Sequence, residues 1–247
     1  MEAVAPTGLD ERPGAVSDPA SNSSGKRSPT HGEGTIVPSE VFRDVLRSES
    51  EVREVVGYPS ELAARKQLAA LDEHCRAFIA RSPFLLLGSA SAAGRCDVSP
   101  RGDVPGFVLV LDEKHLAIPD RPGNRRIDSL RNLLENPQVG LLFVIPGVEE
   151  TLRVNGRACI VRDPEILARM EVMGKQPHLA IGVEVEESFL HCAKAFKRSH
   201  LWETDRWPDR SSLPSMARML LDQTRPAGKT VEDMERALNE SYTKRLY

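Results

Sequence analysis

The sequence predicts an antiparallel β-barrel, closed or split, with helices around it. Three observations support this fold class. First, about seven short apolar runs are bounded by turn residues, as strands are. Second, several connections between these runs are too short for a parallel crossover, so the strands should pair mainly as hairpins. Third, strands and helices do not alternate and there is no G-x-G-x-x-G or Walker loop, which disfavours a doubly wound nucleotide-binding fold.

The chain of 247 residues divides by composition into three parts. Residues 1–38 hold five Pro, five Gly and five Ser and no aromatic residue, so they cannot bury enough apolar surface to offset the entropy of ordering. We predict that this segment is a disordered leader. Order is expected from Val41, with a barrel domain over residues 41–210 and a helical extension over residues 211–247 that is interrupted at residues 226–228.

The expected strands share runs of apolar or alternating residues. They cover residues 84–87, 95–99, 107–111, 115–118, 139–145, 151–161 and 180–185. The expected helices share a capping residue before a helical apolar pattern, or end at a Pro or Gly. They cover residues 60–80, 163–173 and 188–197, a short stretch ending near Asn136, and the tail from residue 213.

Charge and cysteine spacing exclude several classes of protein. Lys and Arg total 33 and Asp and Glu total 36, a net charge of −3, whereas binders of nucleic acid or acidic membranes are usually far more basic. No apolar run approaches the roughly 18 residues of a membrane span. The four cysteines are too far apart for a zinc site, and there is no apolar secretory signal. We therefore expect a cytoplasmic protein with free thiols and no metal.

Two loops carry residues suited to an anion. One follows the second predicted strand, and the other precedes the short helix, whose N-terminus would add the positive end of its dipole. Forked arginine donors match the geometry of a phosphate. The candidate binding residues are Ser99, Pro100, Arg101 and Gly102 in the first loop and Asn124, Arg125 and Arg126 in the second. The alternative is that these arginines form solvated surface pairs with the neighbouring aspartates.

A third basic cluster contains Lys194, Arg198 and Trp202. A basic helix end followed by an aromatic ring could cover a planar ligand. Alternatively, these cations only stabilise the C-terminus of their helix. No Ser-His-Asp order and no paired-carboxylate motif stands out, so the catalytic residues stay unassigned. An enzyme without visible acid–base groups is often one whose cofactor performs the chemistry.

Several segments in order, from about Val41 to the end of the chain, carry a family resemblance. They are residues 97–103, 105–108, 118–126, 136–141, 150–158 and 194–202. With these segments the sequence resembles the pyridoxamine 5′-phosphate oxidase-related, FMN-binding split-barrel family, and is most similar to a bacterial group of FMN-dependent enzymes without a settled substrate.

The resemblance implies a six-stranded antiparallel Greek-key split barrel that forms a homodimer with FMN in clefts at the subunit interface. It implies an FMN-dependent oxidoreductase that transfers hydride through the flavin, with a small-molecule substrate or NAD(P)H as reaction partner. Ser99 and Arg101 match positions that contact the flavin phosphate and ribityl chain, and residues 124–126 match the loop that completes the phosphate site. Lys194, Arg198 and Trp202 match the segment that approaches the flavin, from the partner subunit in one arrangement.

Two points stay open at this stage. The C-terminal Arg/His pattern with which pyridoxamine-phosphate oxidases hold their substrate is not recognisable in this sequence, so activity on vitamin B6 is not expected. The alternative to an enzyme is a non-catalytic protein that uses the same barrel to bind or store a flavin, a deazaflavin or haem, because no substrate-specific acid, base or nucleophile is evident.

Overall fold

The computed structural model describes residues 41–247. These residues belong to two units, which divide between Gly57 and Tyr58. In the first unit, the described part contains helix α1 (Glu49–Val56), which begins at a capping box formed by Ser48 and Glu51. The second unit, Tyr58–Tyr247, holds the sheet and the remaining helices. The predicted leader, residues 1–38, lies outside the described residues.

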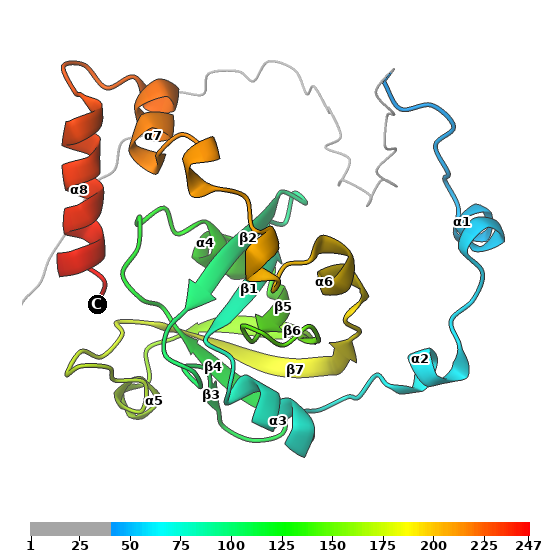
Figure 1. The fold of residues 1–247 in the computed structure, drawn as a ribbon. Coiled ribbons are helices and arrows are strands. Elements are labelled where there is room, and N and C mark those ends of the chain that lie inside the picture. Colours follow the sequence, from blue (N-terminus) through cyan, green and yellow to red (C-terminus); the bar gives the residue numbers. More distant parts are fainter. Residues whose placement is uncertain (1–40) are drawn as a thin grey trace, which may run out of the picture. The chain divides into compact units, whose positions relative to one another are not determined.

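Seven strands in the described part form one sheet in which every pairing is antiparallel (Figure 1). The strands are β1 (Phe84–Ala90), β2 (Cys96–Gly102), β3 (Leu109–Val110), β4 (His115–Pro119), β5 (Gln138–Val144), β6 (Thr151–Val161) and β7 (Ala180–His191). Their order across the sheet is β2-β1-β5-β6-β7-β4-β3. The antiparallel split barrel with flanking helices is confirmed. The sheet has seven strands where the family resemblance implied six, and the shortest strand, β3, has two residues.

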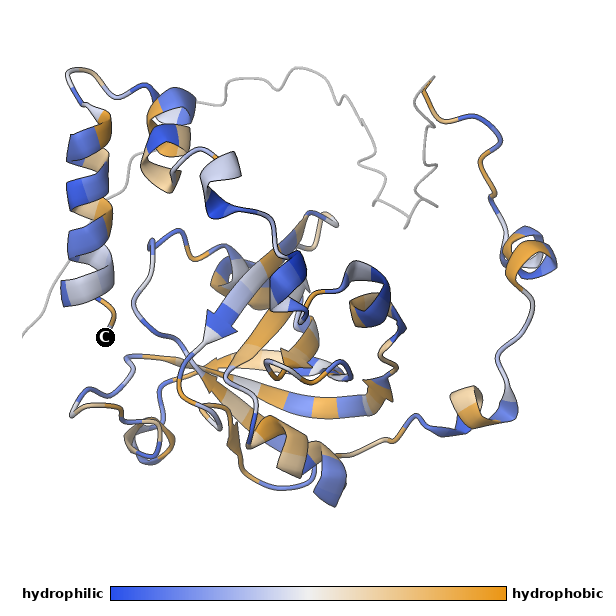
Figure 2. Ribbon diagram, in the orientation of Figure 1, coloured by the Kyte–Doolittle hydropathy of each residue, from blue (hydrophilic) through white to orange (hydrophobic). Residues whose placement is uncertain are grey.

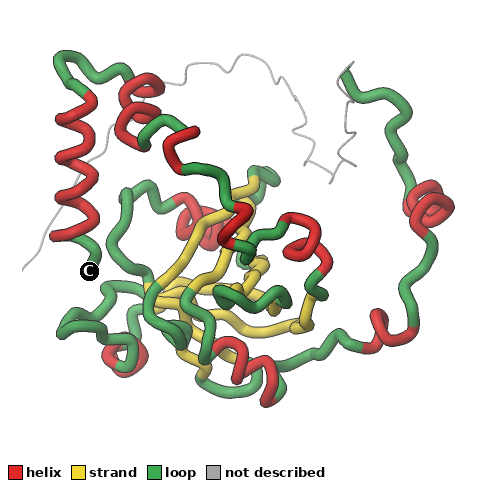
Figure 3. The backbone as a smooth tube through the Cα atoms, viewed as in Figure 1, coloured by secondary structure: helices red, strands yellow, loops and turns green. Residues whose placement is uncertain are grey.

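In the second unit, helices precede β1, connect β4 to β5 and β6 to β7, and follow β7 (Figure 3). They are α2 (Glu61–Arg65), α3 (Glu73–Ile79), α4 (Asp128–Glu135), α5 (Pro164–Ala168), α6 (Lys194–Ser199), α7 (Met216–Thr224) and α8 (Val231–Lys244), with short 3-10 turns at Thr204–Arg206 and Arg210–Ser212. Asp163 caps α5 with Pro164 in its first turn, as predicted. The tail is helical with a break between α7 and α8, also as predicted.

The core includes the central strands β1 and β5, whose ribbons are mostly coloured as hydrophobic in Figure 2. Burial alternates along β1 and β5, so Leu85 and Leu87 of β1 face inward together with Leu141 and Phe143 of β5. All four are at most 1% exposed. The sequence identified these two strands by their continuous apolar runs, so the alternation of burial is a finding of the structure.

The longest strand pair, β6 with β7, changes register at Asn155 and Gly156. A Cβ atom on Gly156 would lie 2.0 Å from the carbonyl oxygen of Glu184 and 3.2 Å from the Cα of Val185. Only glycine allows the two backbones to approach this closely. The irregularity bends two long strands around the core.

Three of the helices expected from local pattern are wrong in extent. The helix expected over residues 163–173 ends at Ala168. The single helix over residues 60–80 is instead α2 and α3, because Leu68 between them exchanges backbone hydrogen bonds with Ser188 at 2.9 and 2.8 Å. Asp72 then caps α3 anew. The helix expected from Ser188 is also wrong, since Ser188 lies within β7 and its hydroxyl donates to the carbonyl of Ala70 at 2.8 Å.

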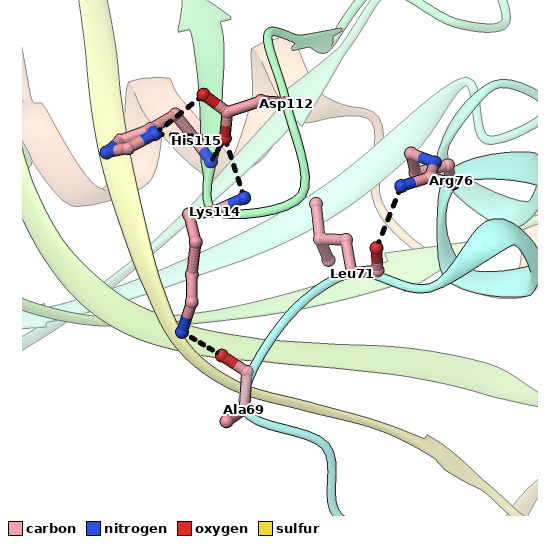
Figure 4. Close-up of polar contacts among 6 residues, drawn as sticks. All are labelled: Ala69, Leu71, Arg76, Asp112, Lys114 and His115. Atoms are coloured by element: carbon pink, nitrogen blue, oxygen red, sulfur yellow. Dashed lines mark hydrogen bonds and ion pairs between the residues drawn. The ribbon is translucent and has the colours of Figure 1, made fainter.

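The segment before α3 is fastened to the β3–β4 turn (Figure 4). Lys114 donates from Nζ to the carbonyl of Ala69, and the amide of Leu71 donates to the carbonyl of Glu113 at 2.8 Å. The carboxylate of Asp112 in turn accepts from the amides of Lys114 and His115. These non-local bonds replace the helical bonds that the sequence pattern had suggested for this segment.

Candidate functional site

A cleft of about 1490 Å³ lies at one end of the sheet. Phe107 and four segments line it: strand β2, the loop that leads from β4 into the first turn of α4, residues 175–179 before β7, and the segment that ends α8. The first two segments contain the residues that the sequence predicted to bind an anion. Residues 99–102 do not form the expected loop, because they belong to β2 and pair with β1. In the strand order β2 and β4 lie toward opposite edges of the sheet, so the cleft brings together segments that the sheet pairing keeps apart.

The structure brings seven of the ten predicted binding residues into this cleft. They are Ser99, Pro100, Arg101, Gly102, Asn124, Arg125 and Arg126. The other three, Lys194, Arg198 and Trp202, are absent from its lining. They belong to α6 and the turn after it, where the indole nitrogen of Trp202 donates to the carbonyl of Val148 at 2.9 Å and its ring stacks on Phe196.

Arg101 connects the two predicted loops. Its Nη1 donates to Oδ1 of Asp120 at 2.6 Å, and the two side chains are 16% and 28% exposed. The Nε of Arg101 is buried and has no hydrogen-bond partner within the described chain. A buried guanidinium donor without a partner is costly unless a ligand or water accepts from it. Arg101 is therefore a group that an acceptor in the cleft would satisfy.

The loop before α4 adopts an uncommon backbone. Arg125 and Ile127 both have positive φ, 60° and 55°, which is unfavourable for any residue with a side chain and most of all for a β-branched one. Ile127 is the N-cap of α4 and provides no side-chain cap, so the first amides of the helix are left open at their positive end. Strained residues of this kind often gather at ligand sites.

Within this loop, the three polar residues have different surroundings. The side chain of Asn124 accepts from the amide of Arg126 at 3.0 Å and holds the turn. The Nε of Arg126 donates to Asp128 at 2.7 Å, and this pair is largely exposed. Arg125 is exposed and has no hydrogen bond or ion pair with any described residue. The alternative of a solvated surface pair thus describes Arg126, but neither the part-buried Arg101 nor the unpaired Arg125.

The cleft is basic although the chain carries a net charge of −3. Its lining, within the part of the chain that the structure describes, includes six Arg or Lys residues and three Asp residues. All three carboxylates accept hydrogen bonds from neighbours: Asp97 from Ser129, Asp120 from Arg101 and Asp128 from Arg126. Unsatisfied positive charge remains, so the cleft suits an anionic ligand.

Sequence reasoning missed a second arginine–aspartate pair beside the cleft. The Nε of Arg121 donates to Oδ2 of Asp103 at 2.6 Å, and its Nη2 donates to the carbonyl of Met170 at 2.8 Å. The other oxygen of Asp103 accepts from the phenol of Tyr247 at 2.7 Å. Because Tyr247 lies 144 residues after Asp103, no local pattern could have indicated this contact.

The pKa of Asp103 reflects these partners. Burial, the largest single influence, acts to raise it, but the hydrogen bonds from Tyr247, from the Val104 amide and from Arg121 together lower the pKa below its ordinary value. The same contact with Asp103 raises the pKa of Tyr247. Asp103 is thus an ionised, fully enclosed carboxylate at neutral pH, which suits an anchor better than a proton-transfer group.

A family model described as pyridoxamine 5′-phosphate oxidase matches residues 71–192, which include β1 to β7 and both segments that the sequence predicts to bind an anion. The chain belongs to the pyridoxamine 5′-phosphate oxidase-like family. No curated protein matches it by sequence. Membership agrees with the predicted resemblance and with the antiparallel split barrel described above.

Among solved structures, HupZ of Group A Streptococcus matches at 15% identity and a TM-score of 0.40, over 48% of this chain and 92% of its own. HutZ of Vibrio cholerae, described as a haem storage protein, matches at 20% identity and a TM-score of 0.36, over 49% and 93%. A Clostridium acetobutylicum protein of the pyridoxinephosphate oxidase family matches at 15% and 0.37, over 48% and 85%. About half of the present chain is covered in each case.

In the described part of the chain, no helix is both long enough and apolar enough to cross a membrane. All four cysteines are free, one of them buried and three exposed.

Proposed function

We propose that this protein is an FMN-dependent oxidoreductase that acts on a small molecule, with NAD(P)H as a candidate electron donor. The observation that carries the proposal is the meeting of the two predicted loops in one basic cleft. When bound, FMN would supply hydride transfer through its ring system. The chain's own residues would bind the cofactor, orient it and shape the space beside it.

The residues of the cleft fit a flavin phosphate. Arg125 and the open amides of α4 offer donors at a helix N-terminus, where a phosphate is favoured by both hydrogen bonds and the dipole. Arg126 lies beside them, and Ser99 and the unpartnered Nε of Arg101 would serve the phosphate or the ribityl chain. Gly123 adds open space, since a Cβ there would meet only the Arg121 carbonyl, at 4.0 Å.

The proposal includes a homodimer, with Lys194, Arg198 and Trp202 directed at the flavin of the partner subunit. It is supported by their separation from the cleft within one chain. Light scattering should then give twice the mass of the chain at micromolar concentration. A stable monomer would remove these three residues from the proposed site.

One observation favours a non-catalytic alternative. Each carboxylate that lines the cleft already accepts a hydrogen bond from Arg or Ser, which leaves none of them free as a general base. The same cleft could therefore bind or store a flavin, a deazaflavin or haem without turning over a substrate. The oxidoreductase proposal does not require a free carboxylate in the cleft, because the cofactor performs the electron chemistry.

The absorbance spectrum of the purified protein tests both functions. We expect flavin bands in the isolated protein or after incubation with FMN, and their loss on anaerobic addition of NADH or NADPH. Flavin bands that no nicotinamide donor or substrate panel bleaches would support the storage protein. A protein that stays colourless after incubation with FMN would contradict both flavin proposals, and a Soret band would indicate haem. Consistent with this function, we propose a cytoplasmic location.

A further inference from the structure

The end of the chain is docked against the cleft. Helix α8 leads to Tyr247 (Figure 1), whose phenol donates to Asp103 at 2.7 Å. The guanidinium of Arg121 lies over the Tyr247 ring, 5.5 Å from its centroid, and Nζ of Lys175 donates to the Tyr247 carbonyl at 2.8 Å. Contacts from three separate segments fix one residue, so the segment that ends α8 has a defined position at the cleft.

The anchor beneath this segment is firmly held. The side chain of Asp103 is fully enclosed, and Arg121 is only 13% exposed and is itself bound to Met170. Charge-assisted hydrogen bonds in such enclosed surroundings are stronger than those on an open surface. The anchor lies at the end of β2, directly after the predicted loop of residues 99–102, and therefore fastens the end of the chain to the proposed cofactor site.

The docked segment and its neighbour form a cationic wall, which we define as Lys175 and Arg245. Neither residues 175–179 nor the end of α8 contributes a carboxylate side chain to the lining, whose three Asp residues all come from β2 and from the loop and first turn of α4. The guanidinium of Arg245 has no hydrogen-bond or ion-pair partner among the described residues, and Lys175 uses one of its three donors on Tyr247. Donors thus remain on this wall.

From this geometry we infer that the cationic wall is a second anion-binding subsite, which receives a phosphate or carboxylate group of the molecule that shares the cleft with the cofactor. The inference deepens the proposed function and rests on it for the identity of the first ligand. It assigns a negatively charged substrate class to the cleft. The docked Tyr247 would act as a positioning residue, because it holds the end of α8 where Arg245 lines the cleft.

Calorimetric titration with inorganic pyrophosphate tests this wall. In the FMN-loaded protein the flavin phosphate already occupies the Arg125 and Arg126 region, so a single further pyrophosphate per chain should report the wall. Lys175→Gln and Arg245→Gln should each weaken that binding about tenfold, the effect of losing one charge-assisted contact. Both residues are exposed, so both variants should fold. Arg236→Gln is the matched control, since Arg236 lies on α8 outside the cleft and pairs with Asp233.

The outcomes separate this inference from the function it extends. Pyrophosphate binding that is absent from the loaded protein, or that Lys175→Gln and Arg245→Gln leave unchanged, would overturn the wall. If Arg236→Gln weakened pyrophosphate binding equally, the inference would also be overturned, because the loss would then reflect the net charge of the protein and not a contact in the wall. If the protein binds no FMN, the titration is repeated with flavin-free protein that carries both Arg125→Ala and Arg126→Ala. If this protein still binds pyrophosphate, and the binding depends on Lys175 and Arg245, the wall is supported although the proposed function has failed.

Discussion

Nη1 of Arg101 and Oδ1 of Asp120 lie 2.6 Å apart and join the end of β2 to the loop that precedes α4. Each residue belongs to one of the two segments that line the proposed phosphate site. Both side chains are mostly enclosed, so the exposure of this pair is intermediate between that of a surface ion pair and that of a buried one. It therefore fixes the distance between the two loops as well as contributing charge to the cleft.

The coupling between these two residues should be measurable in a double-mutant cycle. We expect Arg101→Met and Asp120→Asn to show an interaction energy of about 1–2 kcal/mol in urea unfolding, above the usual value for exposed pairs. The Arg126–Asp128 pair is the matched control, because it has almost the same length, 2.7 Å, but its arginine is 71% exposed. Its coupling should stay below about 0.5 kcal/mol. Equal values for the two pairs would show that enclosure does not strengthen the first.

The phosphate site leads to a prediction about ligand selectivity. Replacing Arg125 or Arg126 with Ala should weaken FMN binding by about one to two orders of magnitude each, since each charge-assisted bond contributes roughly 1.5–3 kcal/mol. Binding of riboflavin, which has the same ring but no phosphate, should change far less. Arg131→Ala on the exposed side of α4 provides the control and should alter neither affinity. Equal losses for FMN and riboflavin would instead place the two arginines at the ring or in a structural role.

The sequence predicted the parts of the molecule whose signals are local. The apolar runs of β1 and β5, the Asp163 cap and the arginine-rich turn of residues 120–126 each depend on neighbouring residues, so these strands, this helix start and this turn were all predictable. The errors arise from distant pairings. Residues 60–80 have a helical pattern, but the hydrogen bonds that Leu68 forms with β7 outweigh one more turn of helix. The docking of Tyr247 is equally non-local, so the cationic wall could not be predicted.

A stability prediction follows from the close approach of β6 and β7. Gly156→Ala should lower the free energy of unfolding by about 3 kcal/mol or more, because the added methyl would meet backbone atoms that cannot move without disturbing the pairing. Gly88→Ala in β1 is the control, since its Cβ would lie at an ordinary 3.5 Å from the Gly140 carbonyl oxygen. That variant should lose about 1 kcal/mol at most. Urea denaturation of both variants measures the difference, and similar midpoints would contradict the proposed clash.

The contact between Tyr247 and Asp103 predicts a change in the acid stability of the fold. Because the folded pKa of Asp103 is lowered, its ionised form stabilises the protein above the ordinary Asp pKa of about 3.9. That stabilisation is lost as the pH falls through the lowered folded pKa. Tyr247→Phe removes one of the hydrogen bonds that lower this pKa, so the folded pKa should rise toward the ordinary value, and the loss of stability with falling pH should be smaller and complete at a higher pH. At neutral pH the variant should also lose about 1 kcal/mol.

Urea unfolding of the two proteins between pH 7 and pH 3 measures both effects, with Tyr242→Phe as the control. Tyr242 lies on α8, shortly before Tyr247, and is 60% exposed, and its hydroxyl bonds to no described residue, so this variant should follow the unmodified protein at every pH. If Tyr247→Phe also followed it, the phenol would not be bound to Asp103 in solution. The end of α8 would then lack its anchor, and Arg245 would lose the support that places it at the cleft.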